Sequence, residues 1–407
     1  MRLERAQSIA DLRRMARRRL PRAVFDFFDG GAEDETTLRA NTAAFESIDF
    51  LPRIMVDVST RSAATSILGV PAKLPLIVGP TGLAALGWPR ADIALARAAG
   101  KFGVPFVVSS SSSVRLEDIA RAAPDTRLWF QVYVYRDREL VQRLIGRARD
   151  AGFEAIVLTA DVPLLGQRER DGRNRFAVPL RPTPRMILDT LLCPQWTLGM
   201  LTHGVPRMQN FVDASAGLES IGSLAALMTA NMDASVNWTD VDSLRDGWRG
   251  KTVLKGVLSA ADAVQAARSG FDAIVVSNHG GRQLDHAPAT MSVLPEIAGA
   301  VAGKLEILLD GGVRRGSDIA KALCLGANAA MLGRATLFGA AAGGERGVER
   351  ALDLLRAELD RCLALIGCPA VRSLGPAFVR GASVVNRATV DREDLSGHEG
   401  SVVARQK

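Results

Sequence analysis

The sequence has few cysteines and no long apolar segment. Only four cysteines occur in 407 residues, and they show neither the spacing of metal ligands nor a disulfide framework (Cys193, Cys324, Cys362 and Cys368). Reduced thiols in a cytoplasmic protein are therefore expected. No uninterrupted apolar run reaches the roughly 18 residues of a membrane span, and no apolar core of a secretory signal follows the first arginines. These absences exclude a disulfide scaffold, a cysteine-based metal site and a helical membrane protein.

Acidic residues are outnumbered by basic ones, and the formal net charge is +7. Such an excess is compatible with nucleic acid, an anionic membrane or an anionic substrate. Much of it lies in the first 22 residues, where a solvated helix face is the usual reason for a run of arginines (Arg2, Arg5, Arg13, Arg14, Arg17, Arg18, Arg19 and Arg22). We therefore expect no nucleic-acid ligand.

From residue 75 onward, short runs rich in valine, isoleucine and leucine alternate with helical stretches. Each run is apolar on both faces, as parallel strands covered by helices are. The eight runs are Leu74–Val78, Val104–Ser109, Leu128–Val134, Ala155–Leu158, Thr252–Leu254, Ala273–Val276, Leu305–Leu309 and Ala329–Leu332. This count predicts an α/β fold of the closed (β/α)8 barrel type. An open doubly wound sheet is the alternative, but Gly79-Pro80-Thr81-Gly82 after the first run is not a dinucleotide fingerprint.

Three segments lie outside this alternation. Residues 1–70 are predicted to be a helical cap, and residues 375–407 a polar C-terminal tail. Residues 162–251 form a long excursion after the fourth strand of the barrel, which spans 71–374. Part of the excursion, residues 186–201, is apolar and flanked by arginines. That pattern suits a membrane interface, with an oligomer contact or a packed excursion as the alternative.

The ends of the predicted strands are nearly all polar, and in such a barrel the active site lies at the ends of the strands. They read Pro80, Thr81 and Gly82; Ser109; Gln131 and Tyr133; Thr159 and Asp161; Lys255; Ser277 and His279; Asp310, Gly311 and Gly312; Gly333 and Arg334. The glycines after the seventh strand, with Arg314 and a helix start near Ser317, predict a phosphate site. A site at this position fits the single phosphate of FMN better than a dinucleotide.

The stretch 277–283, Ser-Asn-His-Gly-Gly-Arg-Gln, combines a titratable base with a fixed cation. His279 is suited to take a proton, while Arg282 holds a carboxylate through two parallel hydrogen bonds. For a lone histidine, the alternative to a catalytic base is a residue in a surface turn at the end of a strand. Asp161 is the candidate partner of the imidazole, and Arg168 is a second candidate cation for the carboxylate.

Four other strand-end residues suit a flavin. Lys255 is suited to stabilise the negative charge of a reduced ring. Gln131, Thr159 and Ser109 are candidates to hydrogen-bond the edge of that ring. An ordinary lysine on the rim is the alternative for Lys255.

Together these motifs resemble those of the FMN-dependent L-2-hydroxy acid oxidising family, which includes glycolate oxidase, L-lactate dehydrogenase and (S)-mandelate dehydrogenase. The resemblance extends from Leu20 to about Leu374 and is greatest with the mandelate dehydrogenase branch, as in residues 232–238 and 314–319. It implies an FMN enzyme that oxidises a mandelate- or lactate-like L-2-hydroxy acid to the 2-oxo acid. By matching residues, the resemblance assigns the base to His279, its aspartate to Asp161, the substrate contacts to Arg168, Arg282 and Tyr133, and the flavin lysine to Lys255.

The chain departs from this family at Phe27, where the family usually has a tyrosine that binds the substrate carboxylate. The missing phenol hydrogen bond has a typical net value of ~1 kcal/mol. The resemblance also implies a homotetramer. For the electron acceptor, we expect a quinone at the inner face of the cell membrane, with oxygen and release of hydrogen peroxide as the alternative. A non-redox FMN isomerase is a further alternative.

Overall fold

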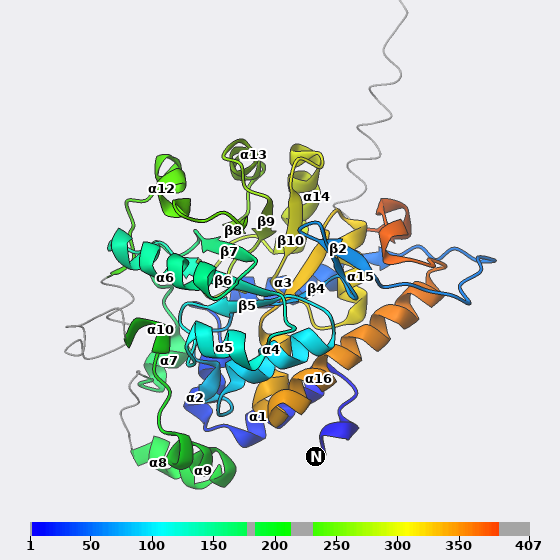
Figure 1. Cartoon of the computed structure of the whole chain (residues 1–407). Helices are drawn as coiled ribbons and strands as arrows, with labels where there is room; N and C mark the ends of the chain where they lie inside the picture. Colours follow the sequence, from blue (N-terminus) through cyan, green and yellow to red (C-terminus); the bar gives the residue numbers. More distant parts are fainter. Residues whose placement is uncertain (1, 177–183, 213–230, 382–407) are drawn as a thin grey trace, which may run out of the picture.

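The structure, a computed structural model, describes residues 2–176, 184–212 and 231–381. Its centre is a barrel of eight parallel strands, which closes where β11 pairs with β4 (Figure 1). The strands are β4 (Leu76–Val78), β5 (Phe106–Ser109), β6 (Leu128–Tyr133), β7 (Ala155–Thr159), β8 (Lys251–Val257), β9 (Ala273–Val276), β10 (Glu306–Leu309) and β11 (Ala329–Leu332). Every expected run forms one strand, so the predicted (β/α)8 barrel is confirmed and the open sheet is wrong.

Helices that alternate with the strands cover the barrel. They are α4 (Ala91–Lys101), α5 (Leu116–Ala122), α6 (Arg138–Asp150), α13 (Ala260–Arg268), α14 (Thr290–Val301), α15 (Gly316–Cys324) and α16 (Arg334–Leu365). Helix α6 shows why they form. Asp137 caps it by accepting a hydrogen bond from the main-chain nitrogen of Leu140, and Leu144 and Ile145 are buried on one face.

Apolar side chains fill the barrel and leave its polar residues at one end. Trp129 of β6 is fully buried in this interior. The hairpin of β2 (Thr65–Ile67) and β3 (Val70–Ala72) adds Ile67 and Leu68 to it. Because Leu68 is bound by Glu306 at the start of β10, the hairpin closes the end where the strands begin. Among the described residues, this leaves the end of the barrel where the strands finish for a ligand.

The N-terminal residues contribute α1 (Ile9–Arg19), α2 (Arg22–Asp29) and α3 (Thr36–Glu46). Helix α1 packs along α16, and α3 packs against α14. The short strand β1 (Asp49–Phe50) pairs with β12 (Val379–Arg380), so the end of the described chain is joined to the segment that follows α3. The expected tail beyond residue 381 lies outside the described residues, and the boundaries at 70 and 374 stay predictions.

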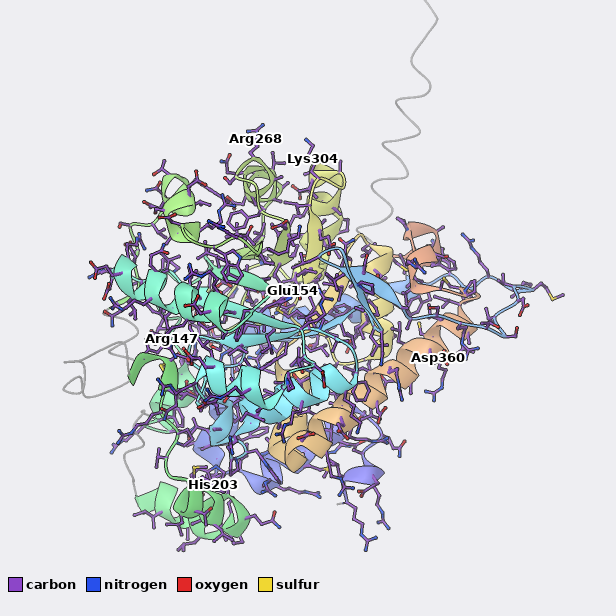
Figure 2. All side chains as sticks on the ribbon, viewed as in Figure 1. Arg147, Glu154, His203, Arg268, Lys304 and Asp360 are labelled. Atoms are coloured by element: carbon purple, nitrogen blue, oxygen red, sulfur yellow. The ribbon has the colours of Figure 1, made fainter. Side chains whose placement is uncertain are left out.

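The excursion between β7 and β8 is mostly helical where the structure describes it. Its elements are α7 (Glu169–Arg173), α8 (Pro184–Leu191), α9 (Pro194–His203), α10 (Gln209–Val212), the 3-10 turn η4 (Trp238–Asp240) and α12 (Val241–Arg245). Helices α8 and α9 lie together at the edge of the molecule, near α1 and α2 (Figure 1), and His203, the last residue of α9, is labelled in Figure 2. None of the helices in the described ranges is long and apolar enough to cross a membrane.

Candidate active site

A cavity of about 440 Å³ lies at the end of the barrel where the strands finish. It is lined by these residues expected from the sequence: Phe27, Pro80, Thr81, Gly82, Ser109, Gln131, Tyr133, Thr159, Arg168, Lys255, His279, Arg282, Asp310, Gly311, Gly312, Arg314, Gly333 and Arg334. The other two expected residues, Asp161 and Ser277, are in contact with this lining, Asp161 with His279 and Ser277 with Lys255. The structure thus brings the whole predicted set together.

His279 occupies a left-handed backbone conformation, with φ at +58°. A non-glycine residue in this region costs free energy, so the surrounding turn must hold it there. Its main-chain nitrogen donates to the Ser277 hydroxyl at 3.1 Å, and its Nδ1 lies 3.0 Å from Oδ1 of Asp161. The imidazole is thereby fixed by both its backbone and its ring.

The His279–Asp161 pair leaves a basic nitrogen facing the cavity. Burial lowers the pKa of His279, although Asp161 opposes this, so the ring is neutral near pH 7. Burial alone would raise the pKa of Asp161, but His279 and Lys255 outweigh it and keep the carboxyl ionised. An ionised carboxylate only accepts, so Nδ1 carries the proton and Nε2 keeps a lone pair.

Lys255 is a buried cation set between two carboxylates. Its Nζ donates to the Ser277 hydroxyl at 2.8 Å and lies 3.2 Å from Asp310 and 4.0 Å from Asp161. Burial lowers the pKa of Lys255, but the two aspartates outweigh it and raise the pKa above its usual value. The group therefore remains charged at the cavity wall.

Two arginines, Arg168 and Arg282, line the cavity together with the carboxyl group of Asp171. Nη1 of Arg282 donates to the carbonyl oxygens of Phe27 at 2.8 Å and Gly30 at 3.0 Å. Burial, then the charges of Arg168 and Arg334, lower the pKa of Arg282 well below its usual value. Burial also lowers the pKa of Arg168, whose Nε has no hydrogen-bond partner among the described residues. Such paired buried cations favour an anionic ligand.

Arg334 was expected to face a phosphate, but its guanidinium is largely occupied by the protein. It donates to the carbonyl oxygens of Phe28 at 3.0 Å, Gly280 at 2.8 Å and Gly30 at 2.6 Å. Burial lowers the pKa of Arg334 to about 9. The residue therefore joins the end of α2 to the turn that carries His279. Arg314 donates to the carbonyl oxygen of Val313 at 2.8 Å and also lines the cavity.

The remaining wall fits FMN. Gly311 and Gly312 both have φ at +89°, and helix α15 starts shortly after them, so main-chain nitrogens are available to a phosphate. Gln131 links Ser109 and Thr159 by hydrogen bonds of 3.2 and 3.1 Å across three adjacent strands, which gives a polar line along a ring edge. Buried oxygens of Thr81 and Asp310 have no hydrogen-bond partner in the described part of the chain and are available to a polar ligand.

Several lining residues were not predicted as site residues. Gly166, Asp171, Phe176 and Met208 come from the excursion, and others, such as Phe28 and Met331, come from the N-terminal helices and the barrel. Phe176 stacks on Phe27 with ring centroids 4.7 Å apart, and this pair forms an aromatic wall. Asp171 follows Arg168 in the sequence, and that proximity was the one available signal. Nothing in the pattern around Phe176 or Met208 indicated a cavity.

Comparisons with known proteins agree with this site. The profile of the FMN-dependent dehydrogenase family matches residues 16–381. Over 384 residues the chain is 47% identical to (S)-mandelate dehydrogenase of Pseudomonas putida, covering 94% of this chain and 96% of that protein. It is 40% identical over 376 residues to L-lactate oxidase of Nostoc sp., covering 91% and 97%.

A solved structure is also similar. The crystal structure of the monotopic membrane protein (S)-mandelate dehydrogenase superposes with a TM-score of 0.89 at 46% identity, covering 93% of this chain and 100% of that chain. These matches confirm the resemblance drawn from the motifs and FMN as the cofactor. The chain belongs to the FMN-dependent dehydrogenase family.

Proposed function

We propose that this protein oxidises a mandelate- or lactate-like L-2-hydroxy acid to the 2-oxo acid. The observation that carries the proposal is the grouping of a neutral buried imidazole with two buried arginines on one FMN cavity. A hydroxy acid has one anionic group to bind and one proton to give at the adjacent carbon or oxygen. A non-redox isomerase has no need for such a pair of carboxylate-binding cations.

The chain's own residues bind the substrate and move a proton. Oxidation of the CH–OH group releases two electrons and two protons, and bound FMN would supply the acceptor for both electrons and one of the protons. Arg168 and Arg282 bind the carboxylate, and Nε2 of His279 takes one proton. Asp161 stabilises the imidazolium that results, since it is ionised and 3.0 Å from Nδ1. Tyr133, whose ring lies over that of His279 with centroids 6.4 Å apart, contacts the substrate hydroxyl or carboxylate.

The same geometry supports a set of FMN contacts. We propose that Lys255 stabilises negative charge on the ring, with Ser277 and Asp310 holding its amine. The remaining proposed contacts come from main-chain groups and polar side chains of the cavity lining: Pro80, Thr81, Gly82, Ser109, Gln131, Thr159, Gly311, Gly312, Arg314, Gly333 and Arg334. Among these, Arg334 acts mainly by holding the wall in place.

The test is anaerobic bleaching of the bound flavin by a panel of lactate, glycolate and aromatic 2-hydroxy acids. Bleaching by the L isomer of at least one acid is expected, and no bleaching by any of them would refute the proposal. Reoxidation of the reduced enzyme by oxygen, compared with a quinone analogue, then separates the acceptors. Faster reoxidation by the quinone is expected, whereas rapid formation of hydrogen peroxide would make the protein an oxidase.

A membrane-bound quinone is proposed because α8 and α9 expose a leucine-rich surface. Leu191 and Leu201 are 70% and 79% exposed, and other apolar side chains of this surface are Ile187, Leu188, Leu192 and Leu198. Exposed arginines of α1 and α2, such as Arg18 and Arg22, lie on the neighbouring elements (Figure 1). Exposed leucines can bury themselves at the boundary of the acyl chains, and arginines can bind anionic headgroups. This surface therefore suits peripheral binding to a membrane. We place the protein in the cytoplasm, on the inner face of the cell membrane.

Replacing Leu191 and Leu201 together by glutamate is expected to release the protein from anionic vesicles. Each buried leucine contributes about 2 kcal/mol, so the partition constant should fall by at least about 10²-fold. Flavin bleaching by the hydroxy acid should not change. Leu365→Glu is the matched control, because Leu365 is also 70% exposed but lies at the end of α16. Equal vesicle binding of the double variant and the control would exclude α8 and α9 as the membrane contact.

We also propose that the protein is a homotetramer. Residues 51–56 form part of an arm that projects from the barrel (Figure 1). Its tip is apolar, with Ile54 and Met55 85% and 99% exposed. The arm is held at its ends, since Arg61 pairs with Asp360 through two hydrogen bonds. A rigid apolar tip in water favours contact with another copy, and sedimentation equilibrium measures the number of copies.

A further inference from the structure

A pair of buried asparagines joins helix α3 to the turn that carries His279. Nδ2 of Asn41 donates to Oδ1 of Asn278 at 2.8 Å, and Nδ2 of Asn278 donates back to Oδ1 of Asn41 at 2.8 Å. The two residues are 1% and 4% exposed and 237 positions apart in the chain. Asn278 directly precedes His279, so this pair fixes the peptide from which the imidazole projects.

Every hydrogen-bonding capacity of the Asn278 amide is used. Besides the bonds with Asn41, its Nδ2 donates to the carbonyl oxygen of Pro288 at 2.9 Å, and its Oδ1 accepts from the nitrogen of Gly281 at 3.1 Å. Two protons and two lone pairs are thus satisfied. Turning the amide over would set oxygen against oxygen and nitrogen against N–H at these partners, so Asn278 has one orientation.

Asn41 also touches the glycines of the expected phosphate site. A side-chain carbon at Gly312 would come within 2.1 Å of the Asn41 carbonyl oxygen, and one at Gly311 would come within 3.3 Å of Asn41 Nδ2. Helix α3 therefore lies against both the base and the phosphate loop. The Asn41 side chain itself is not among the groups that line the cavity in the described structure.

The same helix makes a second buried contact with the loop after His279, but farther from the base. Thr37, which is fully buried, donates from its hydroxyl to the carbonyl oxygen of Ala287 at 3.0 Å. The carboxylate of Asp285 caps the start of the helix by accepting from the nitrogens of Thr36 and Thr37. Loss of the Thr37 bond thus weakens the docking of α3 without disturbing the Asn278 amide.

We infer that Asn41 is a positioning residue for the reaction: through Asn278 it sets the direction of the His279 imidazole relative to FMN. The inference rests on the proposed function, because it assumes that His279 is the base. The left-handed backbone of His279 needs such support, since the turn must oppose its intrinsic preference. Asn41 should therefore affect the proton transfer rather than the binding of the substrate carboxylate.

The experiment compares Asn41→Leu with Thr37→Val in the FMN-loaded protein. Asn41→Leu preserves volume but leaves Asn278 with only Gly281 and Pro288 as partners. A small misplacement of a catalytic group costs about 10²-fold, so kcat and the anaerobic bleaching rate should fall by roughly that factor. KM should stay within about threefold, because Arg168 and Arg282 are untouched. Thr37→Val loses one hydrogen bond where Asn41→Leu loses three, so it should lower Tm by less while keeping kcat within about twofold.

A second variant, Asn41→Asp, keeps the experiment decisive if Asn41→Leu does not fold. Its carboxylate still accepts from Asn278 and Thr290, but it sets an oxygen against Asn278 Oδ1 where Asn41 donates. A loss of kcat at constant KM is expected. Asn41 variants that bleach as fast as the unvaried protein, or that lose no more kcat than Thr37→Val, overturn the inference alone. An unvaried protein that no hydroxy acid bleaches overturns both the inference and the proposed function.

Discussion

His279→Gln should bind FMN and fold normally, yet bleach its flavin with hydroxy acid about 10³-fold more slowly, as expected for loss of a general base. Glutamine keeps a polar side chain of similar reach and can still donate to Asp161. It has no basic nitrogen at pH 7, so the proton that Nε2 would take has no acceptor on the chain. Stopped-flow absorbance under nitrogen measures the rate.

His286→Gln is the control for this result. His286 also has a left-handed backbone, with φ at +60°, and lies seven positions further along the same loop. It is not part of the described cavity lining, so this variant should bleach at the normal rate. Near-normal bleaching by His279→Gln would remove the base from the mechanism.

His279→Gln should also change the pH dependence of kcat/KM. The base is active when neutral, so kcat/KM of the unvaried protein should fall as the pH drops through the pKa of His279. Burial places that pKa below the ordinary value of about 6.5, so the decline should begin on the acid side of it. His279→Gln should lose this limb of the profile. A limb that persists in the variant would belong to another group.

The barrel and most of its site could be predicted because their signals are local. Each strand is largely apolar on both faces, and polar residues lie at or close to its end. Since parallel strands of a barrel finish at one end, residues as distant as Gln131 and Asp310 were bound to meet. This rule needs no knowledge of how the helices pack, and it led to the candidate base His279 and the candidate flavin lysine Lys255. The candidate arginines Arg168 and Arg282 lie in loops, and the motifs and the family resemblance indicated them instead.

The contacts of the N-terminal helices with the site could not be predicted, because they join segments that are distant in the sequence. The sequence shows that Arg334 follows a strand, but not that its guanidinium turns towards the carbonyl oxygens of Phe28 and Gly30, over 300 positions away. The Asn41–Asn278 pair is equally long-range. Phe176 and Met208 reach the cavity from an excursion whose path follows no periodic pattern. Local patterns set the elements, and packing decided which side chains face the ligand.

Arg168→Met should weaken binding of the hydroxy acid more than any other single change in the carboxylate site. A charge-assisted hydrogen bond lost from a buried pair costs about 3 kcal/mol, so kcat/KM should fall by about 10²-fold, mainly through KM. The affinity for FMN should not change. The kcat/KM of Arg168→Lys should lie between the values for Arg168→Met and the unvaried protein, because lysine keeps the charge but loses the planar pair of donors.

Arg173→Met is the matched control for this prediction. Arg173 is on the same helix, α7, and pairs only with Glu169 among the described residues, on an exposed surface. Exposed pairs of this type contribute little, so its kinetics should match the unvaried protein. Equal KM values for Arg168→Met and Arg173→Met would show that Arg168 does not bind the carboxylate.

Phe27→Tyr tests the same carboxylate site in the opposite direction. The Phe27 ring lies 5.3 Å from the Arg282 guanidinium, and its own carbonyl oxygen holds Nη1 of that arginine. The backbone of Phe27 therefore positions Arg282 whatever its side chain is, and a phenol adds one donor without moving the cation. One such bond has a net value of about 1 kcal/mol, so KM should fall about fivefold while kcat stays constant. In Arg168→Met the added phenol should recover part of the lost affinity, because both groups bind the same anion. If Phe27→Tyr left KM unchanged in both backgrounds, the substrate carboxylate would lie away from the aromatic wall.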